Sequence, residues 1–232
     1  LIESVKDYRV LVVGDDIIDE YHYVTPLGKA AKEHLIPVRF DSSEIFIGGV
    51  RAAANHLRTF CREVDVAIHG FATRKVRFVD DNQLRKLFEV HYRGKQHIDG
   101  VYEMNYDAIV LADFGHGAVT PYAIETLCTG NAFLAVSAQT NSSNIGFNLI
   151  TKYPRADYIV IDEPEARLAA ADRNGPIEAV MRKLAHGRCE KFVVTHGRNG
   201  AYGLDNGNFL HQKSSTDLVR DTMGAGDAFF AV

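Results

Sequence analysis

The chain lacks any apolar run long enough to cross a membrane. None of its apolar stretches approaches the ~20 residues that a helix needs to span a bilayer, and Leu1 to Tyr8 carry no signal-peptide pattern. Positive charge is not in excess either, since the formal net charge is -4. A nucleic-acid surface and an anionic membrane surface are therefore disfavoured. We expect a cytoplasmic protein whose partners are small molecules, with neither nucleic acid nor a membrane among them.

Cysteine is sparse and follows no metal-binding or redox pattern. The three cysteines, Cys61, Cys128 and Cys189, are widely spaced and form no C-x-x-C. An odd number at such spacing argues against a disulfide framework and favours reduced structural thiols. Because 46% of the 232 residues are apolar, the chain is able to bury a sizeable core instead.

Several catalytic motifs are missing as well. The chain has no Walker A G-x-x-x-x-G-K-S/T, no H-E-x-x-H, no G-x-S-x-G, and no G-x-G-x-x-G after its first apolar run. These motifs mark the common P-loop, zinc-hydrolase, serine-hydrolase and Rossmann sites. The P-loop, zinc-hydrolase and serine-hydrolase classes are therefore set aside.

Short apolar runs alternate with helical stretches along most of the chain. The runs typical of buried strands are Arg9–Val13, Val64–Ile68, Ala108–Leu111, Ala132–Val136, Tyr158–Ile161 and Phe192–Thr195. The helical stretches are Gly49–Phe60, Pro121–Leu127 with Thr120 as its N-cap, Pro164–Ala171 and Pro176–Ala185. This alternation predicts a mostly parallel α/β sheet covered on both faces.

Two regions interrupt the alternation. Residues 21–47 contain two short strand-like runs, at 36–40 and 44–47. Residues 74–93 contain two more of the same kind. We expect these runs to form a small β layer beside the main sheet, in the position of a lid.

Three aspartates each follow a predicted strand. They are Asp15, Asp113 and Asp162, and in sheets of this type ligands bind beyond the carboxyl ends of the strands. Singly, each is equally well explained as a loop residue or a helix cap. Together they predict three carboxylates along one edge of the sheet.

The most informative stretch is Asp221–Phe229, which reads Asp-Thr-Met-Gly-Ala-Gly-Asp-Ala-Phe. Glycines let backbone N–H groups approach an anion closely, and a helix start adds partial positive charge. Asp227 follows directly, where a carboxylate is useful if it accepts a proton. The stretch predicts a phosphoryl-transfer site, and its plain alternative is a helix cap on a tight turn.

These features occur in the order of a known family. Asp221–Phe229 resembles the C-terminal signature of the ribokinase (PfkB) family of carbohydrate kinases. Gly14-Asp15, Gly48-Gly49, Asp162-x-x-Glu165 and Thr195-x-Gly197 precede it in the family's order. Residues 14–21 and 111–121 are most similar to the heptose-7-phosphate kinase branch. The resemblance implies a three-layer αβα core with a mostly parallel sheet and a small β lid.

The resemblance also implies an ATP- and Mg²⁺-dependent kinase acting on a sugar or a heptose-like sugar phosphate. Asp227 would be the general base, and the N–H groups of Gly224, Ala225 and Gly226 the anion hole. Glu165 would orient Mg²⁺. The residues expected to bind the sugar are Asp15, Asp19, Gly48, Gly49, Asn55 and Asp113. Those expected on the nucleotide side are Asp162, Glu165, Thr195, Gly197 and Thr222.

The resemblance bears on domains and assembly too. Residues 1–232 are expected to form one kinase domain, with lid strands within about 21–47 and 74–93 that also make a homodimer interface. Compared with the family, part of the region near residue 70 and a helical tail beyond Val232 are expected to be absent. That tail would hold the helix of the signature in place.

Three positions depart from the family pattern. Ala52 stands where the family usually has a sugar-binding asparagine, His116 where heptose kinases carry lysine, and Asp162 where an asparagine is usual. Two other functions therefore stay open. One is a binding or regulatory module that kept the fold and lost the chemistry, and the other is a kinase of a nucleoside or vitamin alcohol.

Overall fold

The computed structural model describes residues 2–30, 32–98, 105–142, 144–215 and 224–231. Within them, an eight-stranded sheet has the order β14-β13-β12-β11-β10-β9-β1-β4. From β4 to β12 all neighbours are parallel, and β13 and β14 pair antiparallel at one edge. The strands are β1 (Arg9–Gly14), β4 (Glu63–Ala67), β9 (Ala108–Asp113), β10 (Phe133–Ala138), β11 (Tyr158–Asp162), β12 (Lys191–Thr195), β13 (Ala201–Asp205) and β14 (Asn208–Gln212).

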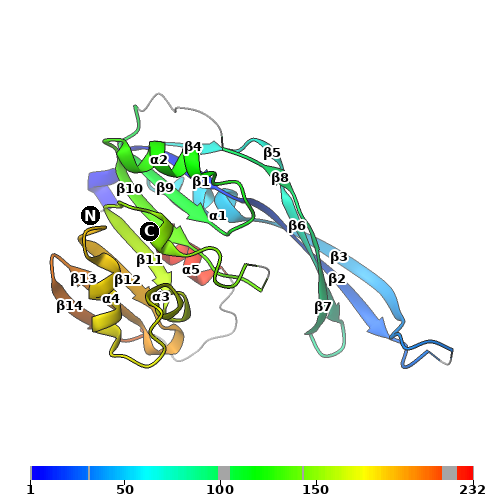
Figure 1. Ribbon diagram of the computed structural model, residues 1–232. Coiled ribbons are helices and arrows are strands. Elements are labelled where there is room, and N and C mark those ends of the chain that lie inside the picture. The colour runs from blue at the N-terminus through cyan, green and yellow to red at the C-terminus, as the bar shows by residue number, and fades with distance from the viewer. Residues whose placement is uncertain (1, 31, 99–104, 143, 216–223, 232) are drawn as a thin grey trace.

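Helices cover both faces of this sheet, so the predicted three-layer α/β core is confirmed (Figure 1). Three helices pack on one face of the sheet: α2 (Pro121–Thr129), α3 (Glu163–Ala170) and α4 (Ile177–Ala185). On the other face pack α1 (Gly49–Leu57) and α5 (Ala225–Ala231). The described residues also form short 3₁₀ helices at η1 (Ile2–Val5), η2 (Ile150–Lys152) and η3 (Gly197–Asn199).

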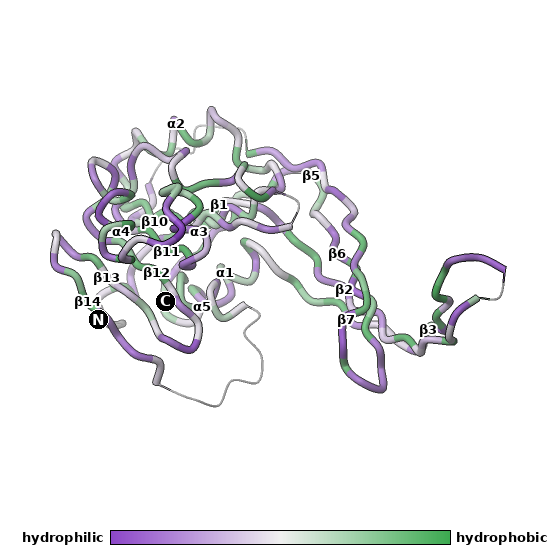
Figure 2. Tube along the Cα trace, turned by 60° about the horizontal axis from the view of Figure 1, so that its bottom comes forward, coloured by the Kyte–Doolittle hydropathy of each residue, from purple (hydrophilic) through white to green (hydrophobic). Residues whose placement is uncertain are grey.

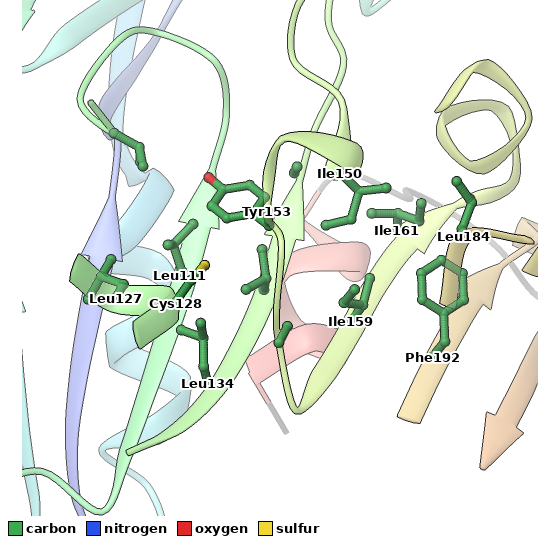
Figure 3. Close-up of a cluster of buried hydrophobic side chains, with 14 of the residues drawn as sticks. Leu111, Leu127, Cys128, Leu134, Ile150, Tyr153, Ile159, Ile161, Leu184 and Phe192 are labelled. Carbon is green, nitrogen blue, oxygen red and sulfur yellow. The ribbon is translucent and has the colours of Figure 1, made fainter. Parts of the chain in front are cut away.

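The larger core lies between the sheet and α2, α3 and α4. Side chains from neighbouring strands, such as Leu111, Leu134 and Ile159, are fully buried there against the helices (Figure 3). Burying each such side chain stabilises the fold by about 1.5–3 kcal/mol. This packing explains why the strands read as continuous apolar runs in the sequence.

Local signals set the starts of α2 and α3. The Thr120 hydroxyl accepts the backbone N–H of Ala123 at 3.2 Å, with Pro121 at the first helical position, as predicted. At α3, the Asp162 carboxylate accepts the N–H of Glu165, whose own carboxylate accepts the N–H of Asp162. This reciprocal capping box fixes both acidic side chains at the carboxyl end of β11.

A second sheet of four strands, in the order β3-β2-β6-β7, forms the lid. It projects from the core as a long arm that carries both apolar and polar segments (Figures 1 and 2). A short antiparallel pair, β5 (Gly70–Phe71) with β8 (Lys95–Gln96), lies near its base. The lid strands are β2 (Asp16–Pro26), β3 (Val38–Gly48), β6 (Thr73–Asp80) and β7 (Arg85–Tyr92).

The predicted boundaries of the lid are wrong in two respects. β2 begins at Asp16, directly after the core, and not at residue 21. The two short strands predicted within 36–47 are one strand, β3, which pairs with β2 from Ile17 to Pro26 across a bulge at Tyr23. Antiparallel pairing extends both strands through polar positions that interrupt their apolar pattern.

Two smaller findings bear on the expected class of protein. In the described part of the chain, no helix is long and apolar enough to cross a membrane. All three cysteines lie in that part, and none forms a disulfide. Burial raises the pKa of Cys128, and raises that of Cys189 to about 12, so both thiols stay protonated near neutral pH.

Candidate active site

Two adjoining cavities open at the carboxyl ends of the core strands. The first, here called the lid-side cavity, has a volume of about 850 Å³ and lies between the lid and the starts of α1 and α5. The second, the core-side cavity, has about 240 Å³ and lies at the ends of β10, β11 and β12. Three residues line both: Gln139, Gly224 and Asp227. These residues therefore mark the place where the two cavities meet.

Asp227 lies in the first turn of α5. Its Oδ1 accepts a hydrogen bond from Nε2 of Gln139 at 2.5 Å. Burial raises the pKa of the Asp227 carboxyl above its ordinary value, and the hydrogen bond from Gln139 opposes that rise. A partly desolvated carboxylate at a cavity junction is suited to accept a proton.

The helix that carries Asp227 is anchored in the core. Phe230 and Ala231 are buried in the same apolar cluster as Val50 and Ala54 of α1, and the two helices pack together. The described part of α5 is therefore held against the core through α1.

The glycine-rich turn precedes this helix. Gly224 has a φ of +72°, a conformation that favours glycine, and its carbonyl accepts the N–H of Ala228 at 2.9 Å. The N–H groups of Ala225, Gly226 and Asp227 precede that first helical bond. Gly224 and Gly226 line the core-side cavity. Thr222, also expected at this site, lies outside the described residues.

The lid contributes charge of both signs to the lid-side cavity. Asp19 of β2 lines it and pairs with Arg77 of β6. Lys75 and Lys86, on β6 and β7, line the same space. Burial lowers the pKa of Lys75. Sequence reasoning missed these three cations, and the signal that would have found them is the period-2 alternation that puts Lys75 and Arg77 on one face of β6.

The two predicted glycines also border this cavity. Gly49 has a φ of +59°, and a Cβ there would lie 2.2 Å from the carbonyl oxygen of Asp15. A Cβ at Gly48 would lie 2.9 Å from Oδ2 of Asp19. These glycines let the start of α1 pass closely against the start of β2.

Two of the predicted carboxylates do not line the cavity. Asp15 is fully buried and accepts the N–H groups of Phe114 at 2.8 Å, His116 at 3.2 Å and Ala118 at 3.0 Å. Burial raises its pKa, and the nearby charge of Asp113 adds to that effect. Asp15 therefore holds the loop after β9 in shape.

Asp113 is equally buried and engaged. Its carboxylate accepts the Tyr153 hydroxyl at 2.5 Å and the N–H of Gly115 at 3.0 Å, and it also pairs with Lys152. Of the three aspartates predicted along one edge, only Asp162 borders a cavity.

The structure also shows which of the positions that depart from the family pattern lie at the cavity. Ala52 lines the lid-side cavity, whereas Asn55, expected to bind sugar in its stead, is exposed and accepts a hydrogen bond from Arg58 at 2.9 Å. Burial lowers the pKa of His116 to about 4. Its imidazole is therefore neutral near pH 7 and supplies no cation to the site.

The core-side cavity contains the predicted acidic pair. Asp162, Glu165 and Thr195 line it, while Gly197 lies beyond its lining in η3. Glu165 Oε1 accepts the N–H of Thr140 at 2.7 Å, and Oε2 accepts the N–H of Asp162 at 2.9 Å. Burial, with the negative charge of Asp162 as a second cause, raises the pKa of Glu165 to about 7.

The carboxylates of the core-side cavity suit a magnesium ion that keeps several of its waters better than a metal held by protein side chains alone. Among the described residues no group of three or more His, Cys, Asp or Glu side chains is placed to hold a metal. Mg²⁺ usually keeps several waters and binds one or two carboxylates together with substrate phosphates. Glu165 and Asp162 supply such carboxylates beside the space where phosphates would lie.

The chain is similar to known carbohydrate kinases over the part that forms the core-side cavity. The model of the pfkB family carbohydrate kinases matches residues 137–232, the part that holds Gln139, Glu165 and Asp227. The resemblance to the PfkB family is confirmed. Curated relatives named bifunctional protein HldE are 25% identical over 281 residues in Rhodopseudomonas palustris and 23% over 280 in Geobacter metallireducens. Each match includes the whole chain but 56% of the relative, so the chain spans about half of their length.

Solved structures show that the fold is ribokinase-like. Phosphofructokinase-2 from Escherichia coli, in its tetrameric inhibited form, matches with a TM-score of 0.74 at 12% identity, over 97% of this chain and 85% of that one. Ribokinase from Thermotoga maritima gives 0.71 at 14%, over 97% and 84%. Arabidopsis thaliana ribokinase, complexed with ribose and ATP, gives 0.69 at 13%, over 97% and 84%.

Proposed function

We propose that the protein is an ATP-dependent kinase that phosphorylates a hydroxyl group of a sugar or sugar phosphate. The observation that carries this proposal is the position of Asp227, in the lining of both cavities at the glycine-rich start of α5. The match to the carbohydrate kinase family and the ribokinase-like fold support it. An acceptor in the lid-side cavity and a nucleotide phosphate in the core-side cavity would meet at this carboxylate.

In this reaction Asp227 accepts the proton of the acceptor hydroxyl. The hydroxyl oxygen forms a bond to the γ-phosphorus while the bond from that phosphorus to the β,γ-bridging oxygen breaks, and ADP leaves with that oxygen. Positioned bases contribute about 10²–10⁴-fold to such steps. The N–H groups of Ala225 and Gly226 would stabilise negative charge on the transferred group.

The core-side cavity would receive the phosphates of ATP with Mg²⁺. Glu165 and Asp162 would hold the ion, which neutralises charge on the phosphates when bound. Thr195, at the end of β12, borders the same cavity. The nucleotide role expected of Gly197 has no support from the lining of the core-side cavity, and Thr222 lies outside the described residues.

A phosphorylated acceptor is the finer form of this proposal. Lys75, Arg77 and Lys86 all border the lid-side cavity, and phosphate groups bind such cations strongly. Asp19 would accept hydrogen bonds from sugar hydroxyls while Arg77 holds its carboxylate in place. The resemblance of residues 14–21 and 111–121 to the heptose-7-phosphate kinase branch favours an acceptor of the heptose-phosphate type.

A nucleoside or vitamin alcohol is the second candidate acceptor. Tyr21, Tyr23 and Phe46 also line the cavity, with the rings of Tyr21 and Phe46 edge to face at 5.6 Å. Flat aromatic walls suit a base or another ring system. The three cations of the lid favour the phosphorylated sugar over this alternative.

The test is turnover of Mg·ATP by the protein against phosphorylated sugars, their unphosphorylated parents and nucleosides. We expect the highest kcat/KM with a phosphorylated sugar. Lys75→Met should raise KM for that substrate by tenfold or more and leave KM for the unphosphorylated sugar nearly unchanged. Equal effects on both would contradict a phosphate contact, and nucleotide binding without transfer would favour the binding module.

A homodimer through the lid remains part of the proposal. On the face of the lid opposite Asp19, the side chains of Phe40, Ile45 and Phe88 are 57%, 65% and 49% exposed. Exposed apolar surface of this kind on a projecting sheet favours association. Ile45→Lys should shift the protein from dimer to monomer in sedimentation equilibrium, whereas Ile145→Lys, at an exposed position outside the lid, should not.

A further inference from the structure

We propose that Gln139 is a positioning residue that orients the Asp227 carboxylate for proton transfer. The inference rests on the function proposed above. Gln139 directly follows β10, and its side chain borders both cavities beside Asp227. No motif in the sequence singles this residue out.

The backbone of Gln139 is held by hydrogen bonds on both sides of its Cα. Its N–H donates to the carbonyl oxygen of Asp113 at 2.7 Å. Its own carbonyl oxygen accepts Nδ2 of Asn148 at 3.0 Å, and Asn148 is itself buried. A side chain on such a clamped backbone is restricted in where it can reach, so its amide is preorganised toward Asp227.

The hydrogen bond itself constrains the base. Nε2 of Gln139 donates to Oδ1 of Asp227 at 2.5 Å, which fixes the rotation of the carboxylate and leaves Oδ2 for a substrate hydroxyl. A neutral amide can donate to the carboxylate at any pH without delivering a proton to it. It therefore favours the ionised form of Asp227 in a site where burial disfavours that form.

Other charged groups near Asp227 act in both directions. Asp19 of the lid raises its pKa, while Lys75 of the lid and His56 of α1 lower it. Within the described residues, none of these three groups donates a hydrogen bond to the Asp227 carboxylate, whereas Gln139 does. The amide is thus the contact through which orientation can be controlled.

The same segment links the base to the core-side cavity. The backbone N–H of Thr140, the next residue, donates to Glu165 at 2.7 Å. Two adjacent residues therefore hold the Asp227 carboxylate, at the junction of the cavities, and the Glu165 carboxylate, in the core-side cavity. A displacement of this segment would change the spacing between acceptor and nucleotide, which is what a phosphoryl transfer depends on.

The test compares Gln139→Met, which keeps the size and removes the donor, with Gln139→Glu, which places a second carboxyl beside Asp227. Gln212→Met, at the end of β14, is the matched control. Two quantities are measured: the ¹³C titration of the Asp227 carboxyl in the protein without substrates, assigned by loss of its signal in Asp227→Asn, and the pH profile of kcat. In Gln139→Met we expect the titration midpoint and the acid limb of kcat to move to higher pH together, with kcat at pH 7 about 10- to 100-fold lower and little change in KM.

Gln139→Glu should move both midpoints further in the same direction, because like charges disfavour ionisation. An unchanged Asp227 titration in both variants would overturn the inference. So would a moved titration with an unmoved acid limb of kcat. Absence of turnover in the wild-type protein would overturn the proposed function instead, and the titration would still decide whether Gln139 controls Asp227.

Discussion

Replacing Tyr153 with phenylalanine tests whether Asp113 is a structural group or a sugar-binding one. Tyr153 is fully buried, and its hydroxyl donates to Asp113 at 2.5 Å (Figure 3 labels the ring). Hydrogen bonds to charged groups contribute about 1.5–3 kcal/mol. Asp113 keeps the N–H of Gly115 and its ion pair with Lys152, so the loss is limited to one bond. We therefore expect the free energy of unfolding to fall by about 1.5–3 kcal/mol.

Urea unfolding of the variant, at constant m-value, measures this loss. Tyr158→Phe is the control, because burial alone raises the pKa of the Tyr158 hydroxyl, with no contribution from a carboxylate, and this variant should lose less stability. KM for the acceptor should be unchanged in Tyr153→Phe. An unchanged stability together with a tenfold higher KM would refute the structural assignment of Asp113.

Three further outcomes follow from the structure. Phe230→Ala should lower the free energy of unfolding by about 3–5 kcal/mol, since Phe230 is buried between α5 and the core. Phe229 is 46% exposed, so Phe229→Ala should cost far less. Similar losses in the two variants would contradict the anchoring of α5. Gly49→Ala should lower the free energy of unfolding by about 1 kcal/mol or more, because φ is +59° and the new Cβ would clash with the carbonyl oxygen of Asp15. Gly146→Ala is the control: the space around its new Cβ is open, so only its positive φ should destabilise it. The pKa of Asp227 is raised by burial, so its basic form is lost as pH falls, and kcat should decline on the acid side at a pH above the ordinary aspartate range; a flat profile down to pH 4 would contradict this.

The core of the fold could be predicted because its signals are local. Runs such as Val10–Val13 are apolar throughout, since both faces of the sheet are covered. Thr120 and Pro121 specify the start of α2 by themselves. The glycine-rich turn likewise predicts an anion site, because its chemistry depends on adjacent residues.

The lid could be predicted only in part. β2 mixes acidic with aromatic and aliphatic residues without a regular alternation, so Asp16–Pro26 does not read as one strand until β3 and β6 pair with it. The convergence of Lys75, Arg77 and Lys86 depends on the same register. The alternation of β6 puts Lys75 and Arg77 on one face, but which face meets the cavity, and how Lys86 approaches from β7, depend on non-local pairing that leaves no local pattern in the sequence.

The carboxylates show a second limit. A position directly after a strand places Asp15 and Asp113 at the correct edge of the sheet, but it does not say which way the side chains point. Backbone N–H groups of the loop after β9 draw Asp15 inward, and the Tyr153 hydroxyl does the same for Asp113. Gln139 was missed for the opposite reason, since a glutamine after a strand is unremarkable until Asp227 lies beside it.

The central claim is that Asp227 is the base of a phosphoryl transfer between the two cavities. The most direct measurement is kcat of Asp227→Asn, with Mg·ATP and the best acceptor, beside wild type and an Asp205→Asn control, whose exposed carboxylate lies at the end of β13, next to the edge strand β14. We expect kcat of Asp227→Asn to fall by about 10²–10⁴-fold, with KM for both substrates nearly unchanged and the control fully active. Equal turnover by Asp227→Asn and wild type would contradict the claim.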